Sequence, residues 1–299
     1  MSERITISGW NSADERGIWQ FWELPESSED IFSLFAAADI RRTRDKALEN
    51  LETLILALTS RLFVLRHHPS FPDPEFAPDR DALNCVRVLT RVLPYLYEKD
   101  TLQEWEERFF WGRRRVRSRK AVIANEVLFD EEQEAQAESG ADEFEDAKPL
   151  AEELIDTLVD LLFFSELTVP QQPPGKPKVS YTIWQSGVGC NVTIPTTKEH
   201  ESNRCEILRL LLTLAGQSMY MSPNVLSQKG TRALTYLCTC PDKQVVLSVL
   251  CSLLNTVRAI MRSFSFWEPA LGCSCGGRVI ANMVPLDSQI QSRELEGAL

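Results

Sequence analysis

Apolar residues recur along this chain mainly with the spacing of an α-helix. Between residues 48 and 62, leucine and isoleucine return mostly every three or four positions and form one stripe. The same periodicity marks four further segments, at residues 84–96, 149–164, 203–220 and 244–261. A shorter helix is expected after Ser27, which can cap it together with Asp30. The pattern predicts an all-α protein whose helices pack in layers.

Pro94 falls inside the second of these segments. It removes the N–H that would bond to the Thr90 carbonyl, and its ring crowds that turn, so the helix is expected to kink or to end near Leu93. Arg87 and Arg91 lie one turn apart just before it, which makes them like-charge neighbours. Two interpretations stay open, a solvated arginine edge on a packing helix or a pair that receives an acidic partner.

The last two helical segments are strongly apolar. In residues 203–220 the polar side chains form one narrow stripe, so this helix is expected to lie between other helices. Residues 245–261 contain no uninterrupted apolar run long enough to span a bilayer, because serines, Asn255 and Arg258 break it. We therefore interpret this segment as a buried helix and not as a transmembrane segment.

Proline and charge mark the connections between the helices. Residues 67–80 and 168–178 each contain four prolines and are expected to be long irregular loops. Residues 112–147 join a basic block to an acidic run and are predicted to form a charged, disordered loop. Strand signals are weak, and the short segment 181–184 is the best candidate for a strand.

Composition limits the classes of partner. Asp and Glu number 43 against 32 Lys and Arg, which gives a formal net charge of −11. This balance disfavours binding to duplex nucleic acid and gives no general attraction to anionic membranes. The N-terminal residues lack the apolar core of a secretory signal. We therefore expect a cytoplasmic protein that is not secreted, with its eight cysteines as reduced thiols.

Two C-x-C pairs are the candidate metal ligands, Cys238 with Cys240 and Cys273 with Cys275. Four thiolates can hold a tetrahedral zinc ion, which would make a small metal-binding module. Zinc ligands are usually two to four residues apart, however, and a long apolar helix separates the two pairs. Unpaired, partly buried thiols are the ordinary alternative.

The sequence gives little support to an enzyme. It has three histidines and contains no G-x-S-x-G, Walker or H-E-x-x-H motif. The glycines at 187 and 189 lack the third glycine of a dinucleotide-binding fingerprint. We therefore predict no catalytic residue, no cofactor and no small-molecule substrate.

Aromatic residues cluster near the N-terminus and again near residue 110. The two groups are Trp19, Phe21 and Trp22, and Phe109, Phe110 and Trp111. Core packing of the N-terminal region against the next helices is the default interpretation, and an exposed docking groove is the alternative. Our candidates for protein-interaction residues are Trp19, Trp22, Arg87 and Arg91.

Several unlike motifs follow one another along the chain. They read IWQFW at 18–22, SEDIFSLFAAADIR at 28–41, LNCVRVLTRVLPYLYE at 83–98, RFFW at 108–111, PLAEELIDTLVDLLF at 149–163, YTIWQSGVG at 181–189, NRCEILRLLLTLAGQSMYMSP at 203–223 and SLLNTV at 252–257. In this order they resemble the N-terminal part of the high-temperature-induced dauer-forming protein family, which is related to dymeclin. The resemblance covers about residues 18–257.

The resemblance implies a fold and a role. Members of the family are peripheral membrane proteins of the Golgi and cytosol that act in protein sorting and secretory-vesicle traffic, with no known catalytic activity. They are long helical assemblies, so the resemblance implies an armadillo- or HEAT-like α-solenoid fragment with long irregular loops. It also implies a non-enzymatic scaffold or adaptor whose partners are other trafficking proteins and the Golgi membrane surface.

Three features depart from the family pattern, namely the residue after Met1, the basic-acidic stretch at 112–147, and the shorter length with a match that fades after Val257. Animal members begin Met-Gly and resemble myristoylation substrates, whereas Ser2 follows Met1 here, so no acyl anchor is expected at that position. Residues 1–257 form the family region, and residues 258–299 are interpreted as a divergent tail from truncation or mis-splicing. A non-functional fragment whose last helices lack their stacking neighbours is therefore a further alternative.

Overall fold

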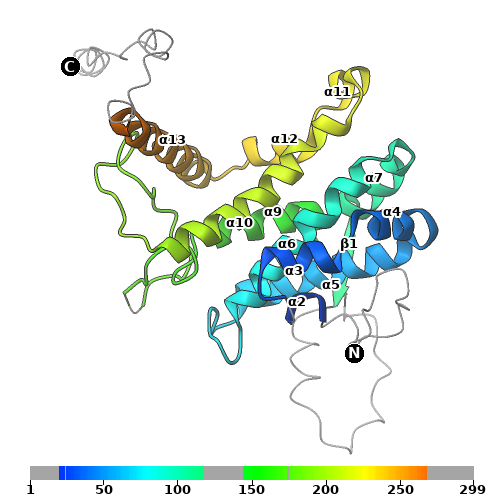
Figure 1. Ribbon diagram of the computed structural model, residues 1–299, viewed down its shortest axis with the longest axis horizontal. Coiled ribbons are helices and arrows are strands. Elements are labelled where there is room, and N and C mark those ends of the chain that lie inside the picture. The colour runs from blue at the N-terminus through cyan, green and yellow to red at the C-terminus, as the bar shows by residue number, and fades with distance from the viewer. Residues whose placement is uncertain (1–19, 24, 118–143, 174, 268–299) are drawn as a thin grey trace, which may run out of the picture.

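The computed structural model describes residues 20–23, 25–117, 144–173 and 175–267, and most of them are helical (Figure 1). The first half contains α2 (Gln20–Glu23), α3 (Ser28–Leu34), α4 (Ala37–Lys46), α5 (Leu48–His67), α6 (Asp79–Tyr97), the 3₁₀ turn η2 (Asp100–Leu102) and α7 (Gln103–Trp111). The second half contains α9 (Leu150–Leu161), α10 (Lys198–Ala215), the 3₁₀ turn η3 (Gly216–Tyr220), α11 (Pro223–Lys229), α12 (Arg232–Cys238) and α13 (Lys243–Trp267). The expectation of a mainly helical protein is confirmed.

Helix α6 is the centre of the fold. It contacts α2, α3, α4 and α5 on one side and α10 on the other. Its apolar residues are almost completely buried because helices cover it from both directions, as Figure 1 shows for α3, α5 and α10. Helix α9 continues the core by packing against α5, α7, α10 and α12.

Pro94 does not end α6, which continues to Tyr97. Of the two alternatives, an end near Leu93 is therefore excluded, and a kink at the proline stays a prediction. Leu93 and Leu96 are both buried, so core packing carries the helix past the missing hydrogen bond. After the proline, the amide of Glu98 donates to the Pro94 carbonyl at 3.2 Å and closes the last turn.

The start of α3 follows the predicted capping box. The Asp30 amide donates to the Ser27 hydroxyl at 3.3 Å, and the Ser27 amide donates to the Asp30 carboxylate at 2.9 Å. The hydrogen bonds from Ser27 and from the Glu26 and Ser27 amides lower the pKa of Asp30. The cap fixes the direction in which the N-terminal segment reaches α6.

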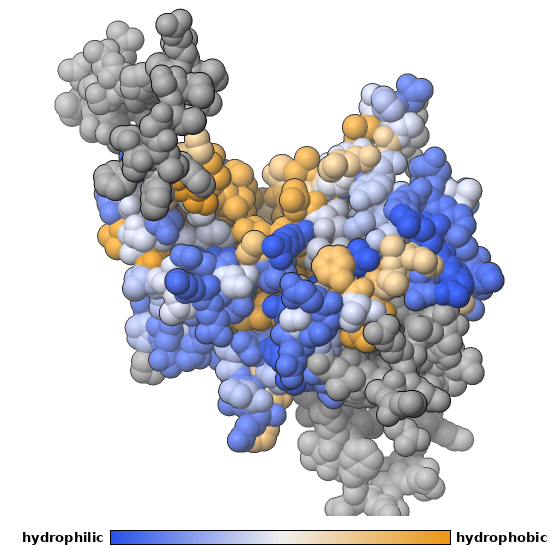
Figure 2. All heavy atoms as spheres, in the orientation of Figure 1, coloured by the Kyte–Doolittle hydropathy of each residue, from blue (hydrophilic) through white to orange (hydrophobic). Residues whose placement is uncertain are grey.

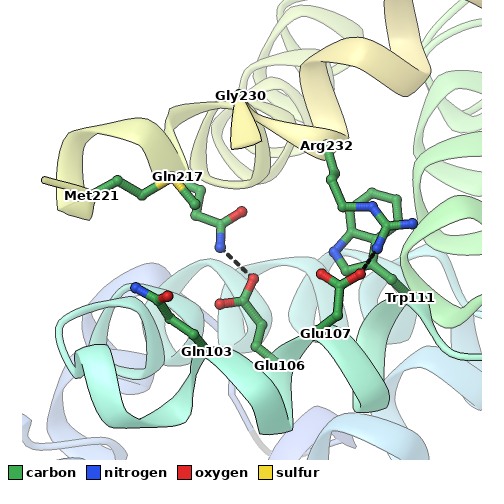
Figure 3. Close-up of a pocket in the computed structure, with 8 residues that line it drawn as sticks. All are labelled: Gln103, Glu106, Glu107, Trp111, Gln217, Met221, Gly230 and Arg232. Atoms are coloured by element: carbon green, nitrogen blue, oxygen red, sulfur yellow. Dashed lines mark hydrogen bonds and ion pairs between the residues drawn. The ribbon is translucent and has the colours of Figure 1, made fainter. Parts of the chain in front are cut away.

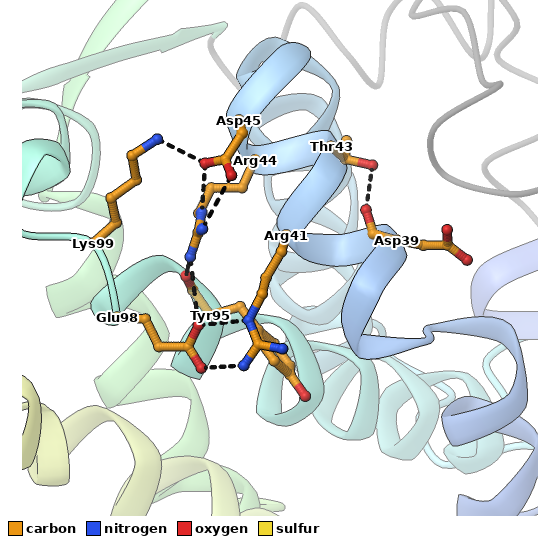
Figure 4. A network of polar contacts seen from close by, with 8 residues as sticks. All are labelled: Asp39, Arg41, Thr43, Arg44, Asp45, Tyr95, Glu98 and Lys99. Carbon is orange, nitrogen blue, oxygen red and sulfur yellow. Dashed lines mark hydrogen bonds and ion pairs between the residues drawn. The ribbon is translucent and has the colours of Figure 1, made fainter.

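Helix α4 is tied to the end of α6 by a polar network at the surface (Figure 4). Arg41 donates two hydrogen bonds to the Glu98 carboxylate, at 2.8 and 2.9 Å. Arg44 donates to the Tyr95 carbonyl at 2.7 Å and forms an ion pair with Asp45. The Asp45 carboxylate also accepts a hydrogen bond from the Lys99 ammonium at 2.6 Å. Three cations and two carboxylates therefore bridge elements that lie about fifty residues apart in sequence.

A two-stranded antiparallel sheet replaces part of the expected charged loop. Strands β1 (Arg114–Arg117) and β2 (Phe144–Ala147) pair with Arg114 opposite Ala147. The two ends of the 112–147 segment are thus paired strands, residues 118–143 lie outside the described part of the chain, and disorder within the segment stays a prediction.

Residues 181–184 do not form the predicted strand. Within the described chain no strand lies beside them, and their backbone bonds partly to side chains of α13 and partly to neighbouring loop residues such as Ile194. The Ser248 hydroxyl donates to the Tyr181 carbonyl at 2.8 Å, and the Trp184 amide donates to the Ser252 hydroxyl at 3.3 Å. Helix side chains therefore supply the partners that a sheet would otherwise provide.

Arg204 anchors the irregular segment between α9 and α10. It is 5% exposed, lies 4.6 Å from the centre of the Trp184 ring and donates to the Thr168 carbonyl. Burial lowers the pKa of Arg204 to about 10, so the guanidinium stays charged at neutral pH. Helix α10 is covered on the side that carries Arg204, while Leu212 on another side is 72% exposed. The prediction that α10 is enclosed over most of its circumference holds only for part of it.

Candidate protein-interaction groove

An apolar groove separates α13 from α9 and α12. It encloses about 500 Å³. Figure 2 shows hydrophobic atoms gathered on α13 and on α12, on either side of a hollow. The apolar lining residues come from three helices and are Ile155, Val159, Leu234, Leu237, Val245, Val246, Val249, Leu250 and Leu253.

Two polar clusters lie among the residues that line the groove. Arg66 pairs with Asp160, which also accepts a hydrogen bond from the Tyr181 hydroxyl. Burial first, and then this hydrogen bond, raise the pKa of Tyr181. At neutral pH the Tyr181 hydroxyl is therefore a protonated donor, and this part of the groove lining carries a satisfied network.

The second cluster likewise places one cation and one tyrosine hydroxyl on a single carboxylate. Lys148 contacts Asp156 at 2.8 Å, and the Tyr236 hydroxyl donates to the same carboxylate at 3.0 Å. Burial and then the Asp156 hydrogen bond raise the pKa of Tyr236 to about 12, while the hydrogen bond to Asp156 raises the pKa of Lys148. These charges satisfy one another, so the groove presents mainly apolar surface to an incoming group.

Helix α13 places its polar residues inward. Ser248, Ser252 and Asn255 are 5%, 0% and 1% exposed. Asn255 accepts from the Val188 amide at 2.8 Å and donates to the Gln185 and Val188 carbonyls at 2.9 and 3.1 Å. These three polar residues thus bond to the backbone of the 181–188 loop, whereas Val245, Val249 and Leu253 pack against the core and the exposed apolar residues lie farther round the helix.

The prediction that this segment is a buried helix is therefore wrong. Leu254 and Val257 are each 60% exposed, because the inward positions are taken by serine and asparagine. Within the described chain, residues Lys243–Arg262 form one helix long and apolar enough to cross a membrane, with 17% of its apolar window buried. Its inward hydrogen bonds nevertheless hold it against the 181–188 loop.

The arginines selected from sequence have partners inside the chain. Arg87 donates to the Asn84 side chain at 2.9 Å and lies 3.8 Å from the Glu206 carboxylate. Arg91 donates to the Phe35 carbonyl at 3.1 Å, and its guanidinium lies 4.5 Å from the centre of the Phe32 ring. Both side chains hold other elements against α6, and their role in partner capture stays a prediction.

Of the two tryptophans selected from sequence, Trp22 lies in the described chain. Trp22 is 4% exposed and belongs to the core, while Trp19 lies outside the described residues. Trp105, Phe109 and Phe110 stack edge and face with centroids 4.9 to 6.0 Å apart. Trp22, Trp105 and Phe110 therefore pack in the interior, and a docking role for Trp19 and Trp22 remains a prediction.

Asn84 is the important residue that the sequence reasoning missed. It is completely buried and donates to the Trp22 and Pro25 carbonyls at 2.8 and 2.7 Å. Its side-chain oxygen accepts from Arg87. A polar residue inside the apolar stripe of a helix was the available signal.

The cysteines considered for metal binding lie at the groove or outside the described chain. Cys238 and Cys240 line the groove and are free thiols, and Cys273 and Cys275 are outside the described residues. Across residues 20–117 and 144–267, as far as they are described, no group of three or more Cys, His, Asp or Glu could hold a metal ion.

A second cavity of about 570 Å³ lies between α7 and the turn that leads to α12 (Figure 3). Gln217 donates to Glu106, and Arg232 pairs with Glu107 across it. The Arg232 guanidinium also lies 4.7 Å from the centre of the Trp111 ring. These contacts cross the cavity and hold α7 against Gln217 and Arg232 on its other side.

Comparison with protein families decides the relationship of the chain. The family model of the high-temperature-induced dauer-formation protein, Hid1, matches residues 6–271. This chain belongs to the Hid1 family. The match includes the groove and all of α13, so the surface described above lies within the Hid1 region.

The Hid1 relatives are much longer than this chain. The Ubp5-interacting protein ftp105 of Schizosaccharomyces pombe is 36% identical, over 80% of this chain and 31% of its own length. Protein HID1 is 31% identical in Mus musculus and 30% in Homo sapiens, over 83% of this chain and 30% of each relative. The chain therefore spans about a third of the length of these relatives. No solved structure matches the chain.

Proposed function

We propose that this chain is a non-enzymatic helical scaffold or adaptor in protein trafficking, peripherally associated with Golgi membranes. The observation that carries the proposal is the Hid1 family match over residues 6–271. A trafficking role is what the family resemblance implies. One relative is named for its interaction with another protein, Ubp5, which supports a binding role.

The groove supports a scaffold more than an enzyme. Four of its five charged side chains form the pairs Arg66–Asp160 and Lys148–Asp156, the fifth, Asp242, accepts the Gln244 amide, and both tyrosines are held protonated. A general base or an activated nucleophile would need a titratable group poised near neutral pH and aimed into the groove. The apolar lining instead suits the capture of apolar side chains from another protein.

An α-solenoid arrangement is part of the proposal. Helix α10 packs against both α6 and α9, and a solenoid would continue such packing by stacking further helices. The longer relatives have the length for further layers. In that arrangement the partners would be other trafficking proteins bound on the extended surfaces.

Cell fractionation tests this function. Cells expressing the tagged full chain are separated alongside a Golgi marker, and the membrane fraction is washed with high salt and then at alkaline pH. A peripheral scaffold sediments with the marker and is released by the washes. A chain that stays wholly in the supernatant, or that resists both washes, would contradict the proposal.

A further inference from the structure

The outward face of α13 carries an apolar stripe with regular spacing. Leu247, Leu250, Leu254, Val257 and Met261 follow one another in steps of three, four, three and four residues. Each is between 51% and 60% exposed. A repeat that averages 3.5 residues is the spacing that lets one helix seat its side chains between those of a second helix.

The stripe is held in place by the opposite face of the same helix. Ser248, Ser252 and Asn255 lie on that face and bond to the 181–188 loop. Across the groove, Leu234 of α12 is 50% exposed and adds a second apolar wall. The result is a preformed apolar trough, and preformed surfaces bind with less loss of conformational entropy.

The charge along α13 has one sign. The helix contains Lys243, Arg258 and Arg262 and no Asp or Glu from residue 243 to residue 267. Lys243 and Arg258 are exposed, and the nearest preceding carboxylate, Asp242, accepts the Gln244 amide at 2.9 Å. Asp242 lines the groove at the start of the helix, but two copies of α13 that paired along the stripe itself would bring only the cations of the two helices together, so charge along α13 favours a partner that carries carboxylates.

From this geometry we propose that α13 and the groove beside it dock an amphipathic helix of another protein, with Asp or Glu flanking its apolar stripe. The proposal rests on the proposed scaffold function and names its partner chemistry. A helix laid into an apolar groove is a recurrent mode of recognition. A membrane surface fits less well, because an interfacial helix needs a convex apolar face and this face borders a hollow of about 500 Å³.

The test uses the purified full chain and two designed peptides. Both peptides are helical with leucines in three-four spacing, one flanked by glutamates and the other by lysines. Measured by fluorescence anisotropy, the Kd of the glutamate peptide for the chain should be at least about tenfold lower than that of the lysine peptide. The preference should shrink as salt is added, because exposed charges are screened.

Matched leucine variants locate the binding face. Leu254→Glu should raise the Kd of the glutamate peptide by at least about tenfold, while Leu212→Glu on α10 should leave it within about twofold. Leu212 is 72% exposed and Leu254 60%, so neither change should disturb the core. Arg258→Glu should reduce or reverse the preference between the two peptides. Unchanged far-UV circular dichroism and melting temperature confirm that the variants are folded.

Four outcomes would overturn the proposal. They are no peptide binding, equal binding by the Leu254→Glu and Leu212→Glu variants, equal affinity for both peptides, or a wild-type dimer in sedimentation that Leu254→Glu dissociates. Vesicles of phosphatidylcholine and phosphatidylserine test the membrane alternative, and Leu254-dependent vesicle binding without peptide binding would favour it. Peptide binding is measured without cells, so its failure is distinguishable from a failure of the fractionation test.

Discussion

At the residue scale, single buried polar groups fix how the segments meet. Asn84 satisfies two carbonyls of the N-terminal segment and accepts from Arg87 at the same time. Buried polar groups are costly when one partner is removed, because the others lose their hydrogen bonds without regaining water. Asn84 therefore has more influence on stability than its size suggests.

Replacement of Asn84 by alanine should show this directly. Asn84→Ala leaves the Trp22 and Pro25 carbonyls without this donor, so the free energy of unfolding should fall by about 3 kcal/mol. Urea denaturation followed by circular dichroism measures it. Asn191 is exposed, and Asn191→Ala should change stability by less than about 0.5 kcal/mol. Equal effects of the two substitutions would contradict the role given to Asn84.

Thiol reactivity tests burial at single residues. Cys85 is completely buried, and burial raises the pKa of its thiol, so the reactive thiolate form is suppressed at neutral pH. Cys205 and Cys238 are exposed. Iodoacetamide followed by peptide mass spectrometry should label Cys205 and Cys238 first and Cys85 only after unfolding. Labelling of Cys85 at a similar rate in the native protein would show that α6 is not covered as described.

At the scale of elements, periodicity predicted which segments are helices but not which way they face. The stripe in α5 and the capping box of α3 follow from local sequence, and the structure confirms both. The orientation of α13 depends on the 181–188 loop, which lies far away in sequence. The failed strand at 181–184 has the same cause, because Ser248 and Ser252 of α13 bond to its backbone at Tyr181 and Trp184. Among the candidate residues, only a tertiary arrangement could show that Arg87 and Arg91 face other parts of α3, α6 and α10.

The network between α4 and α6 should make their contact sensitive to acid. Hydrogen bonds from Arg44 and then Lys99 lower the pKa of Asp45 to about 2, and a hydrogen bond from Arg41 lowers the pKa of Glu98. A carboxylate whose pKa is depressed by folding stabilises the protein above its unfolded pKa of about 4. That contribution is lost as the pH falls through the folded pKa, here toward pH 2.

The prediction is a difference between two melting curves. The melting temperature of the wild type should fall more steeply between pH 5 and about pH 2.5 than that of the Asp45→Asn, Glu98→Gln double variant, which has lost the titrating groups. Added salt should narrow the difference, because these side chains are near the surface. Parallel curves for the two proteins would mean that the network contributes nothing to stability.

At the scale of the whole molecule, the packed helices leave an apolar groove open along α13. The core around α6 and α9 is closed, whereas the stripe on α13 and the groove beside it present apolar surface. Large exposed apolar patches rimmed by polar residues mark interaction surfaces in soluble proteins. Membership in the Hid1 family and the position of α13 inside the matched residues give this surface its proposed role in trafficking.

The central claim is that the α13 groove carries the partner binding on which the scaffold function depends. The most direct measurement is the fraction of tagged chain that sediments with a Golgi marker, compared between wild type, a Leu250→Glu, Leu254→Glu double variant, and Leu212→Glu. The account predicts that the double variant moves to the supernatant while Leu212→Glu sediments like the wild type. Identical sedimentation of all three proteins would contradict it.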